Sequence, residues 1–113
     1  MRTILLLFLI PLSTASFAEE CIPKNAQTCD ELGCTQSDSA IKIYTNDSNK
    51  SVNRCDSRGC SEVVVEIRES GVMKKYGNVL SGYLLLVNSL DNSFTEIATS
   101  LNTVFIKSGV CVR

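Results

Sequence analysis

The sequence predicts a small all-β protein, an antiparallel meander of about six to eight short strands that closes into a barrel or a sandwich. Three observations predict this fold. After position 40, apolar residues recur at every second position, the period of a strand with one buried face. Asn, Asp, Ser and Gly residues mark turns roughly every 8–12 residues, as in sandwiches and barrels. Six cysteines in a short chain supply disulfide staples.

The first 18 residues have the pattern of a secretory signal peptide. Arg2 precedes an apolar run over residues 4–12, and Ser16 and Ala18 place small side chains before the cleavage point. A membrane-spanning helix needs roughly 20 apolar residues, about twice this run. We therefore expect cleavage after Ala18 and a soluble periplasmic or secreted product, residues 19–113, with no membrane span.

The charge balance of the expected product argues against nucleic acid as a partner. Removing Arg2 leaves ten basic and 12 acidic side chains, a net charge of −2, and no basic stripe is present. A chain of this length forms one small domain that buries only roughly two-thirds of its unfolded surface. Covalent cross-links are expected to supply part of its stability.

Residues 19–39 differ in pattern from the rest of the chain. They hold three cysteines and Pro23 with little apolar periodicity, which predicts a loop-like N-terminal arm ordered by its cysteines. The β-domain is expected over residues 40–113. Its first strand is "IKIYT" at 41–45, and the polar stretch at 46–49 is typical of a turn.

The clearest strand is "SEVVVEIR" at 61–68, in which Val63, Val65 and Ile67 share one face. A shorter and more polar run, "VMKKYGN", follows it. The segment "GYLLLVNS" at 82–89 is apolar on both faces, which indicates a central or covered strand.

The segment 93–105 fits two structures. Ser93 and Glu96 match a helix capping box, whereas Thr95, Ile97, Thr99 and Leu101 alternate as in a strand. The turn spacing of the whole chain favours two strands joined at "SLN". The last strand, 103–109, then leads to the final cysteine.

The cysteines include two nearly identical motifs, "CDELGC" at 29–34 and "CDSRGC" at 55–60. A zinc site is one interpretation, but the chain has no histidine and ligand cysteines are most often two residues apart. A redox pair would also prefer the shorter spacing. We favour structural staples, in which Asp begins a turn and Gly supplies a positive φ. The favoured pairing is Cys21–Cys111, Cys29–Cys34 and Cys55–Cys60; a crossed pairing between the two motifs is the alternative.

The sequence indicates no catalytic residues, metal ligands or cofactor, and we expect a non-enzyme. Without histidine, the usual nucleophile–base and histidine–metal sites cannot form. Asp47, Asp91 and Glu96 fall in segments rich in Asn and Ser that lack the spacing of a calcium loop, so turn formation accounts for them. No glycine-rich phosphate loop is present.

The run from "RCDSRGC" to "SFTEIATSLNTVFIKSGVC" resembles small exported proteobacterial proteins of unassigned function, which carry Cys-Asp-x-x-Gly-Cys, Phe-x-Glu-x-Ala-Thr and a terminal Gly-x-Cys. The layout is also similar to that of periplasmic inhibitors of C-type lysozyme. Those are disulfide-tied β-barrels in which a Ser-rich loop and a late Lys-Gly engage the lysozyme cleft. Here Ser89, "LDNSF" and "IKSG" fall at comparable places, but the Ser-Gly-x-x-Tyr motif is absent and Val104-Phe105 replaces a Phe-Trp pair.

These features favour a binding or inhibitory module for a protein partner in the cell envelope, such as a cell-wall-active enzyme like lysozyme. The predicted contact residues are Ser89, Asp91, Phe94 and Lys107. One alternative is a carrier of a small apolar ligand, with Val65, Leu84 and Phe105 lining its cavity. Another is an envelope structural or stress protein with no dedicated ligand.

Overall fold

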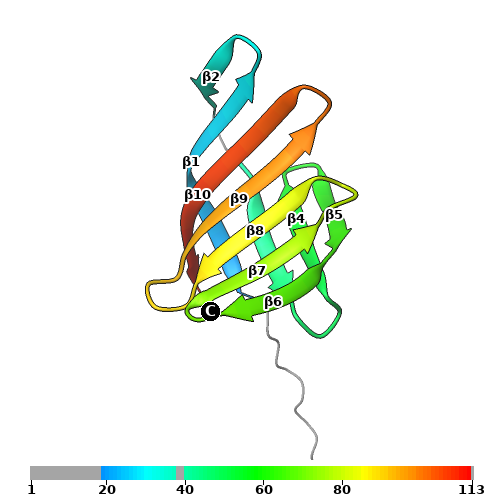
Figure 1. Ribbon diagram of the computed structural model, residues 1–113, viewed down its shortest axis with the longest axis vertical. Helices are drawn as coiled ribbons and strands as arrows, with labels where there is room; N and C mark the ends of the chain where they lie inside the picture. Colours follow the sequence, from blue (N-terminus) through cyan, green and yellow to red (C-terminus); the bar gives the residue numbers. More distant parts are fainter. Residues whose placement is uncertain (1–18, 38–39, 113) are drawn as a thin grey trace, which may run out of the picture.

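The chain is all-β in its computed structural model, which describes residues 19–37 and 40–112. The expected signal peptide, residues 1–18, lies outside the described residues. Ten strands and no helix occur in the described part (Figure 1), so the predicted fold class is confirmed. The strands are β1 (Glu20–Asp30), β2 (Gly33–Gln36), β3 (Lys42–Asn46), β4 (Ser51–Asp56), β5 (Gly59–Val64), β6 (Glu66–Ser70), β7 (Met73–Asn78), β8 (Tyr83–Asn88), β9 (Ser93–Ser100) and β10 (Thr103–Val112).

The strands form one antiparallel sheet that curls into a nearly closed barrel. Its order is β5-β4-β3-β1-β10-β9-β8-β7-β6, and β2 pairs with β1 outside this path. The two outermost strands, β5 and β6, follow each other in the chain. A single stretch, residues 59–70, therefore joins the two edges of the sheet, pairing first with β4 and then with β7.

The change of partner occurs at Val65. Its amide donates to the carbonyl of Lys50 (2.9 Å), and the Asn78 side chain donates to the carbonyl of Val64 (2.7 Å), so β3–β4 and β7 are both fastened to this point. The sequence predicted a continuous strand over 61–68. The structure splits it, because a strand that serves both edges of a barrel must bend between them.

The barrel interior is filled by side chains from alternate strand positions. In β8, for example, Tyr83, Leu85 and Val87 are buried, while the residues between them face outward. Tyr83 pairs across the sheet with Ala98 of β9, and Val87 pairs with Phe94. The buried apolar cluster comprises Cys21, Ile43, Val52, Val65, Tyr76, Tyr83, Leu85, Val87, Phe94 and Cys111.

The prediction of a loop-like arm at 19–39 was wrong for its described residues. β1 lies between β3 and β10 in the middle of the sheet, and its end turns into the short β2. A register shift between Pro23 and Asn25 interrupts the alternation in β1. That bulge removes the period-two pattern by which a strand is recognised in a sequence. The segment 93–105, in contrast, forms the predicted pair of strands, β9 and β10.

Antiparallel pairing sorts the turns to opposite ends of the barrel. We call the end with turns 31–32, 57–58, 79–82 and 101–102 the stapled end, and the end with turns 47–50, 71–72 and 89–92 the terminal end. Figure 1 shows the β1–β2 and β9–β10 hairpins projecting together at the stapled end. The Cys21–Cys111 disulfide joins the first and last strands at the terminal end.

Three disulfides connect the described cysteines, Cys21–Cys111, Cys29–Cys34 and Cys55–Cys60. This is the pairing that the sequence favoured over the crossed one. Three disulfides in so small a fold are typical of an oxidising compartment. No helix among the described residues is long and apolar enough to cross a membrane.

Candidate functional site

The interior of the barrel contains a buried ion pair that spans it. Arg54 of β4 reaches across to Glu96 of β9 and donates from Nε to Oε2 (2.8 Å) and from Nη2 to Oε1 (3.2 Å). The hydroxyl of Tyr83 donates to Glu96 Oε2 (2.6 Å). Burial, followed by the charge and hydrogen bond of Glu96, raises the pKa of Tyr83. Both oxygens of this carboxylate are therefore occupied by donors from β4 and β8.

Lys107 of β10 lies next to this network and is only 8% exposed. It is the cross-strand neighbour of Glu96, and its ammonium lies 5.8 Å from the centroid of the Phe105 ring. Burial lowers the pKa of Lys107; the Glu96 charge opposes that shift and the Arg54 charge adds to it. The interior thus contains two cations and one carboxylate on three neighbouring side chains.

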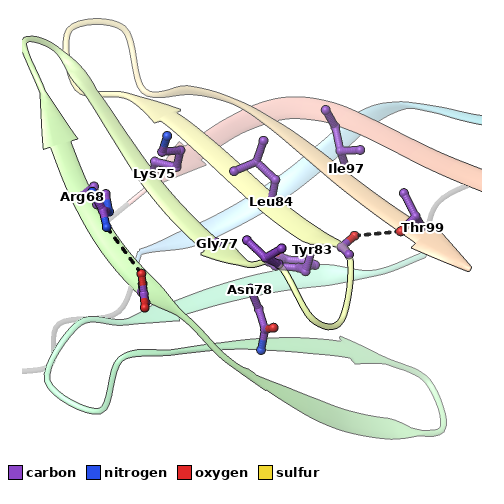
Figure 2. Close-up of a pocket in the computed structure, with 11 residues that line it drawn as sticks. Arg68, Lys75, Gly77, Asn78, Tyr83, Leu84, Ile97 and Thr99 are labelled. Atoms are coloured by element: carbon purple, nitrogen blue, oxygen red, sulfur yellow. Dashed lines mark hydrogen bonds and ion pairs between the residues drawn. The ribbon is translucent and has the colours of Figure 1, made fainter.

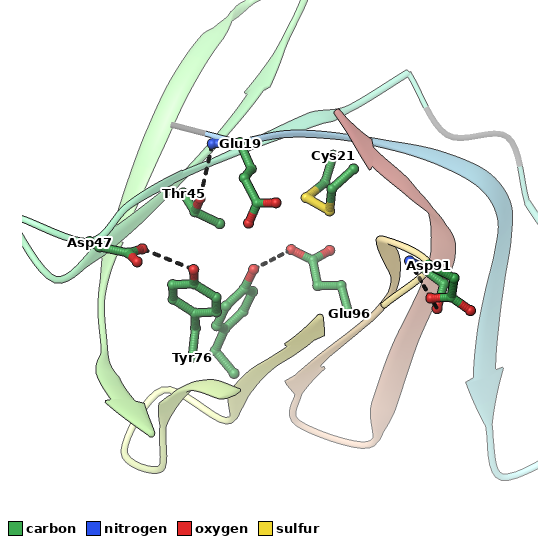
Figure 3. Close-up of a disulfide and its surroundings, with 10 residues drawn as sticks. Glu19, Cys21, Thr45, Asp47, Tyr76, Asp91 and Glu96 are labelled. Atoms are coloured by element: carbon green, nitrogen blue, oxygen red, sulfur yellow. Dashed lines mark hydrogen bonds between the residues drawn. A yellow bond between two sulfur atoms is a disulfide. The ribbon is translucent and has the colours of Figure 1, made fainter. Parts of the chain in front are cut away.

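A second polar network closes the terminal end. Asp47, in the β3–β4 turn, accepts a hydrogen bond from the Tyr76 hydroxyl (2.9 Å; Figure 3). It also forms an ion pair with Lys74. Burial and the hydrogen bond to Asp47 raise the pKa of Tyr76 to about 12. The Thr45 hydroxyl accepts a hydrogen bond from the amide of Glu19 (3.2 Å), beside the Cys21 disulfide. This network ties the turn, the first strand and β7 together.

The two CDxxGC motifs form the same structure, a disulfide-bracketed hairpin with a two-residue turn. In the first, Asp30 Oδ1 accepts from the Leu32 amide (2.9 Å), and Gly33 adopts φ +123°. In the second, Asp56 Oδ1 accepts from the Arg58 amide (2.8 Å), and Gly59 adopts φ +140°. Asp therefore fixes the turn, Gly allows the positive φ, and the disulfide joins facing positions of the two strands. The two middle residues of each turn are exposed.

The turns of the stapled end expose aliphatic side chains that contact no core. Leu32 is 97% exposed, and Leu101, in the β9–β10 turn, is fully exposed. These two turns lie together, because the Asn102 side chain donates to Glu31 Oε1 (3.4 Å). Val79 and Leu80 in the β7–β8 turn are equally exposed. Single exposed apolar residues are common on protein surfaces, but two on neighbouring hairpin tips, Leu32 and Leu101, form a candidate contact surface.

The outer wall of the barrel carries a groove of about 580 Å³ over β6–β9 (Figure 2). Its floor is apolar: Leu84 pairs with Gly77 on one side and with Ile97 on the other. Gly77 has no side chain to fill the floor. Arg68 and Lys75 contribute cationic groups to the lining. This groove has the size and apolar lining of many small-ligand sites.

The structure separates the four predicted contact residues. Ser89 and Asp91 are exposed in the β8–β9 turn of the terminal end, where Ser89 donates to the Val72 carbonyl (2.9 Å). Asp91 accepts from the amide and hydroxyl of Ser93, which lowers the pKa of Asp91.

Phe94 and Lys107 are buried inside the barrel and do not share a surface with Ser89 and Asp91. Both occupy inward positions of their strands, and Phe94 packs in the core. Glu96, which the sequence assigned to a turn, also lies buried in β9. Sequence reasoning missed Arg54, Leu32 and Leu101 as well. For the two leucines, the sequence offered one signal: aliphatic residues occupy turn positions that normally favour polar ones.

The described residues do not bring metal-binding side chains together. All six cysteines are oxidised in disulfides, so no thiolate is available to zinc, and no group of three or more His, Cys, Asp or Glu residues forms a cluster in residues 19–37 and 40–112. Comparison of the chain with protein-family models, with curated proteins and with solved structures found no match.

Proposed function

We propose that this protein is an exported binding module that engages a protein partner through the stapled end of its barrel. The periplasm or the extracellular space is the proposed location, supported by three disulfides and by the signal-peptide pattern of residues 1–18. Cell-wall-active enzymes such as C-type lysozyme are the first partners to test. The proposed contact differs from the turn that the sequence favoured.

The observation that carries the proposal is the pair of neighbouring tips that present Leu32 and Leu101. Leu101 adopts φ +54°, a left-handed conformation that a leucine enters at a cost of about 1 kcal/mol. The fold gains nothing in return, because the side chain is fully exposed. Contact with another molecule supplies a reason for a strained leucine in a position that suits Asn or Gly.

The first tip is also held rigid before any partner arrives. The Cys29–Cys34 disulfide and the Asp30 hydrogen bond fix the backbone on both sides of Leu32. A contact residue on a rigid turn loses little conformational entropy on binding, which favours affinity. The hydrogen bond between Asn102 and Glu31 holds the second tip against the first. The two leucines then act as one apolar contact.

The charges around the tips indicate the chemistry of the partner. Asp30 and Glu31 directly precede Leu32, and residues 27–36 and 97–106 contain no lysine or arginine. An anionic membrane surface attracts basic residues, so this acidic surface is poorly suited to it. An apolar depression with a basic rim on another protein complements both the leucines and the carboxylates.

The test compares exposed leucines at opposite ends of the barrel. Binding and inhibition of C-type lysozyme are measured with wild-type protein, with Leu32→Ser/Leu101→Asn, and with Leu90→Ser as the matched control. Leu90 is 79% exposed at the terminal end. We expect the double variant to bind at least tenfold more weakly and Leu90→Ser to bind as wild type.

If the wild-type protein leaves lysozyme fully active at micromolar excess, lysozyme is not the partner. A photo-reactive amino acid at position 32 then identifies partners from envelope extract by cross-linking, with position 90 as the control. Equal cross-linking from positions 32 and 90 would exclude the stapled end as the contact surface. A double variant that binds as well as wild type would exclude it too.

The groove on the outer wall supports a second candidate function, transport of a small amphipathic ligand. Its apolar floor and the nearby Arg68 and Lys75 suit a molecule with an apolar body and an acidic group. The cavity differs from the predicted one, because Leu84 faces this groove whereas Val65 is buried in the core. Gly77→Leu is expected to fill the floor and abolish retention of a medium-chain fatty acid in native mass spectrometry. Retention by that variant would argue against the groove.

A further inference from the structure

The strand β5 leaves one of its two backbone edges unpaired. It stands at one end of the sheet order and pairs only with β4 (Figure 1). Opposite residues of an antiparallel ladder alternate between hydrogen-bonded and non-hydrogen-bonded pairs. The Val65 amide donates to the Lys50 carbonyl, and these two residues are the next opposite pair of the β4–β5 ladder. Cys60, Glu62 and Val64 therefore point their amides and carbonyls away from β4.

Most of these outward groups have no partner within the described residues. The Val64 carbonyl accepts from the Asn78 side chain (2.7 Å). The three amides and the other two carbonyls make no hydrogen bond with residues 19–37 and 40–112. Cys60, Glu62 and Val64 are all exposed. Such a row of free donors and acceptors is a template for a further strand.

The opposite end of the sheet is protected against pairing, whereas β5 is not. Three of the five residues of β6 are charged: Glu66, Arg68 and Glu69. Charged side chains on an edge strand disfavour the addition of another strand. β5 has one charged residue, Glu62, in six, and it contains no lysine, no proline and no register shift against β4. The open edge of β5 is therefore suited to strand addition.

An apolar depression of about 250 Å³ adjoins the end of β5. Val64, Val79 and Leu80 line it, together with Gly77, which has no side chain to fill it. Val64 is 64% exposed, and Val79 and Leu80 are almost fully exposed. Because Val64 belongs to both the edge and the depression, a strand added to β5 places one of its side chains there.

The charges along this edge favour a basic occupant. Glu62 forms no ion pair within the described residues, and Glu66, which lines the depression, has only an exposed pair with Arg68 at 3.7 Å. Arg58, in the turn before β5, lies 4.0 Å from Asp56. Basic side chains complement the two glutamates. A second copy of this chain would instead bring its own Glu62 and Glu66 to the same seam.

From these contacts we propose that β5 binds an extended segment of a partner protein, which adds an antiparallel strand to the open edge. The segment carries a basic residue opposite Glu62 and an apolar residue opposite Val64. Backbone hydrogen bonds supply affinity in this mode of recognition, and alternate side chains supply specificity. The edge is separate from Leu32 and Leu101, so this proposal and the proposed function can fail independently.

The first experiment titrates the oxidised protein with the peptide Thr-Lys-Thr-Val-Thr-Lys-Thr, blocked at both ends, and follows the backbone amides of β5 by NMR. We expect saturable shifts at Cys60, Glu62 and Val64. Methylation of the lysine and valine amide nitrogens, which face β5 in antiparallel pairing, is expected to weaken binding at least tenfold. Methylated threonine amides point away and should leave binding intact. Equal affinities of the two methylated peptides, or no saturable shift with the unmodified peptide, would overturn the proposal.

The second experiment changes the edge itself. Glu62→Pro removes an amide that β4 does not use, and edge strands tolerate proline at such positions, so circular dichroism should match wild type. We expect it to bind the peptide at least tenfold more weakly, whereas Glu62→Gln, which keeps the amide, should lose about threefold. Unchanged binding by a folded Glu62→Pro would contradict backbone pairing. If this variant fails to fold, the methylated peptides still decide the question in wild type.

Sedimentation velocity tests the other occupant of the edge. We expect wild-type protein to be monomeric at micromolar concentration. A wild-type dimer that Glu62→Pro dissociates would show that a second copy occupies the edge, and it would overturn the proposal of a partner segment.

Discussion

The two ends of the barrel have different residues in their turns. At the terminal end, Asp47 and Asp91 accept hydrogen bonds from neighbouring groups, and a disulfide joins the first and last strands. At the stapled end, the turns present Leu32, Leu101 and other exposed aliphatic residues, and two short-range disulfides stiffen the hairpins. The terminal end thus serves the stability of the fold, whereas the stapled end holds side chains away from it.

The largest expected effect comes from the disulfide at the terminal end. Replacing Cys21 and Cys111 by Ser frees a loop of 90 residues in sequence separation and is expected to cost about 4–5 kcal/mol of unfolding free energy. Replacing Cys29 and Cys34 opens a loop with a separation of five and should cost about 2 kcal/mol. Urea unfolding measures both. Equal losses would contradict the division of roles between the two ends.

The next effect compares the two interior networks. Glu96→Gln leaves both Arg54 and Lys107 without a counter-charge in the interior, and we expect a loss of about 3–5 kcal/mol. Asp47→Asn should cost only about 1 kcal/mol, because the side chains of Asp47 and Lys74 are partly exposed and water can replace the lost contact. The same urea measurement tests both. A larger loss for Asp47→Asn would reverse this ranking.

Alkaline pH should act first on the terminal end. The pKa of Tyr76 is raised from 10.0 to about 12, so the folded state holds this proton more tightly than the unfolded state. Its stabilising contribution, about 2–3 kcal/mol, is complete below pH 10 and is lost as the pH rises through about 12. Unfolding free energies between pH 8 and 12 test this. Tyr76→Phe should flatten that dependence, and an unchanged slope in the variant would contradict the assignment.

The smallest effect is a gain in stability at the stapled end. Leu101→Asn places a residue that tolerates a left-handed backbone at φ +54° and should raise the unfolding free energy by about 1 kcal/mol. Leu32→Asn is the matched control, because Leu32 is equally exposed but has no positive φ, and it should change stability little. If both variants change the unfolding free energy by the same amount, relief of backbone strain at Leu101 is not the cause of the gain.

Strands with regular alternation could be predicted from the sequence, and strands shaped by barrel closure could not. β8 and the pair β9–β10 follow from apolar periodicity and turn spacing. β1 was missed because a bulge at Pro23 breaks its period and because its inward residues include small or polar ones, such as Ala26. The break at Val65 depends on which strands lie at the two sheet edges, a property of the whole topology.

The candidate sites were harder to predict, because burial of a polar residue depends on distant partners. The sequence around Glu96 is typical of a surface carboxylate. Its burial depends on Arg54, which lies 42 residues earlier in the chain and contacts it across the barrel. Lys107 lies in a strand with mixed composition, and nothing local indicates that it faces inward. The CDxxGC turns were the exception, since Asp, Gly and paired cysteines act within one hairpin.

The pairing of the cysteines also constrains how the chain matures. Cys21 and Cys29 are the first two cysteines along the chain, but their partners are Cys111 and Cys34. An oxidant that joins thiols in order of appearance would form a non-native Cys21–Cys29 bond, and only thiol–disulfide exchange could then release it. The local bridges can form as soon as their hairpins appear, whereas the terminal bridge must wait until the last strand has joined the sheet. Formation of this last bond therefore reports that the whole barrel has assembled.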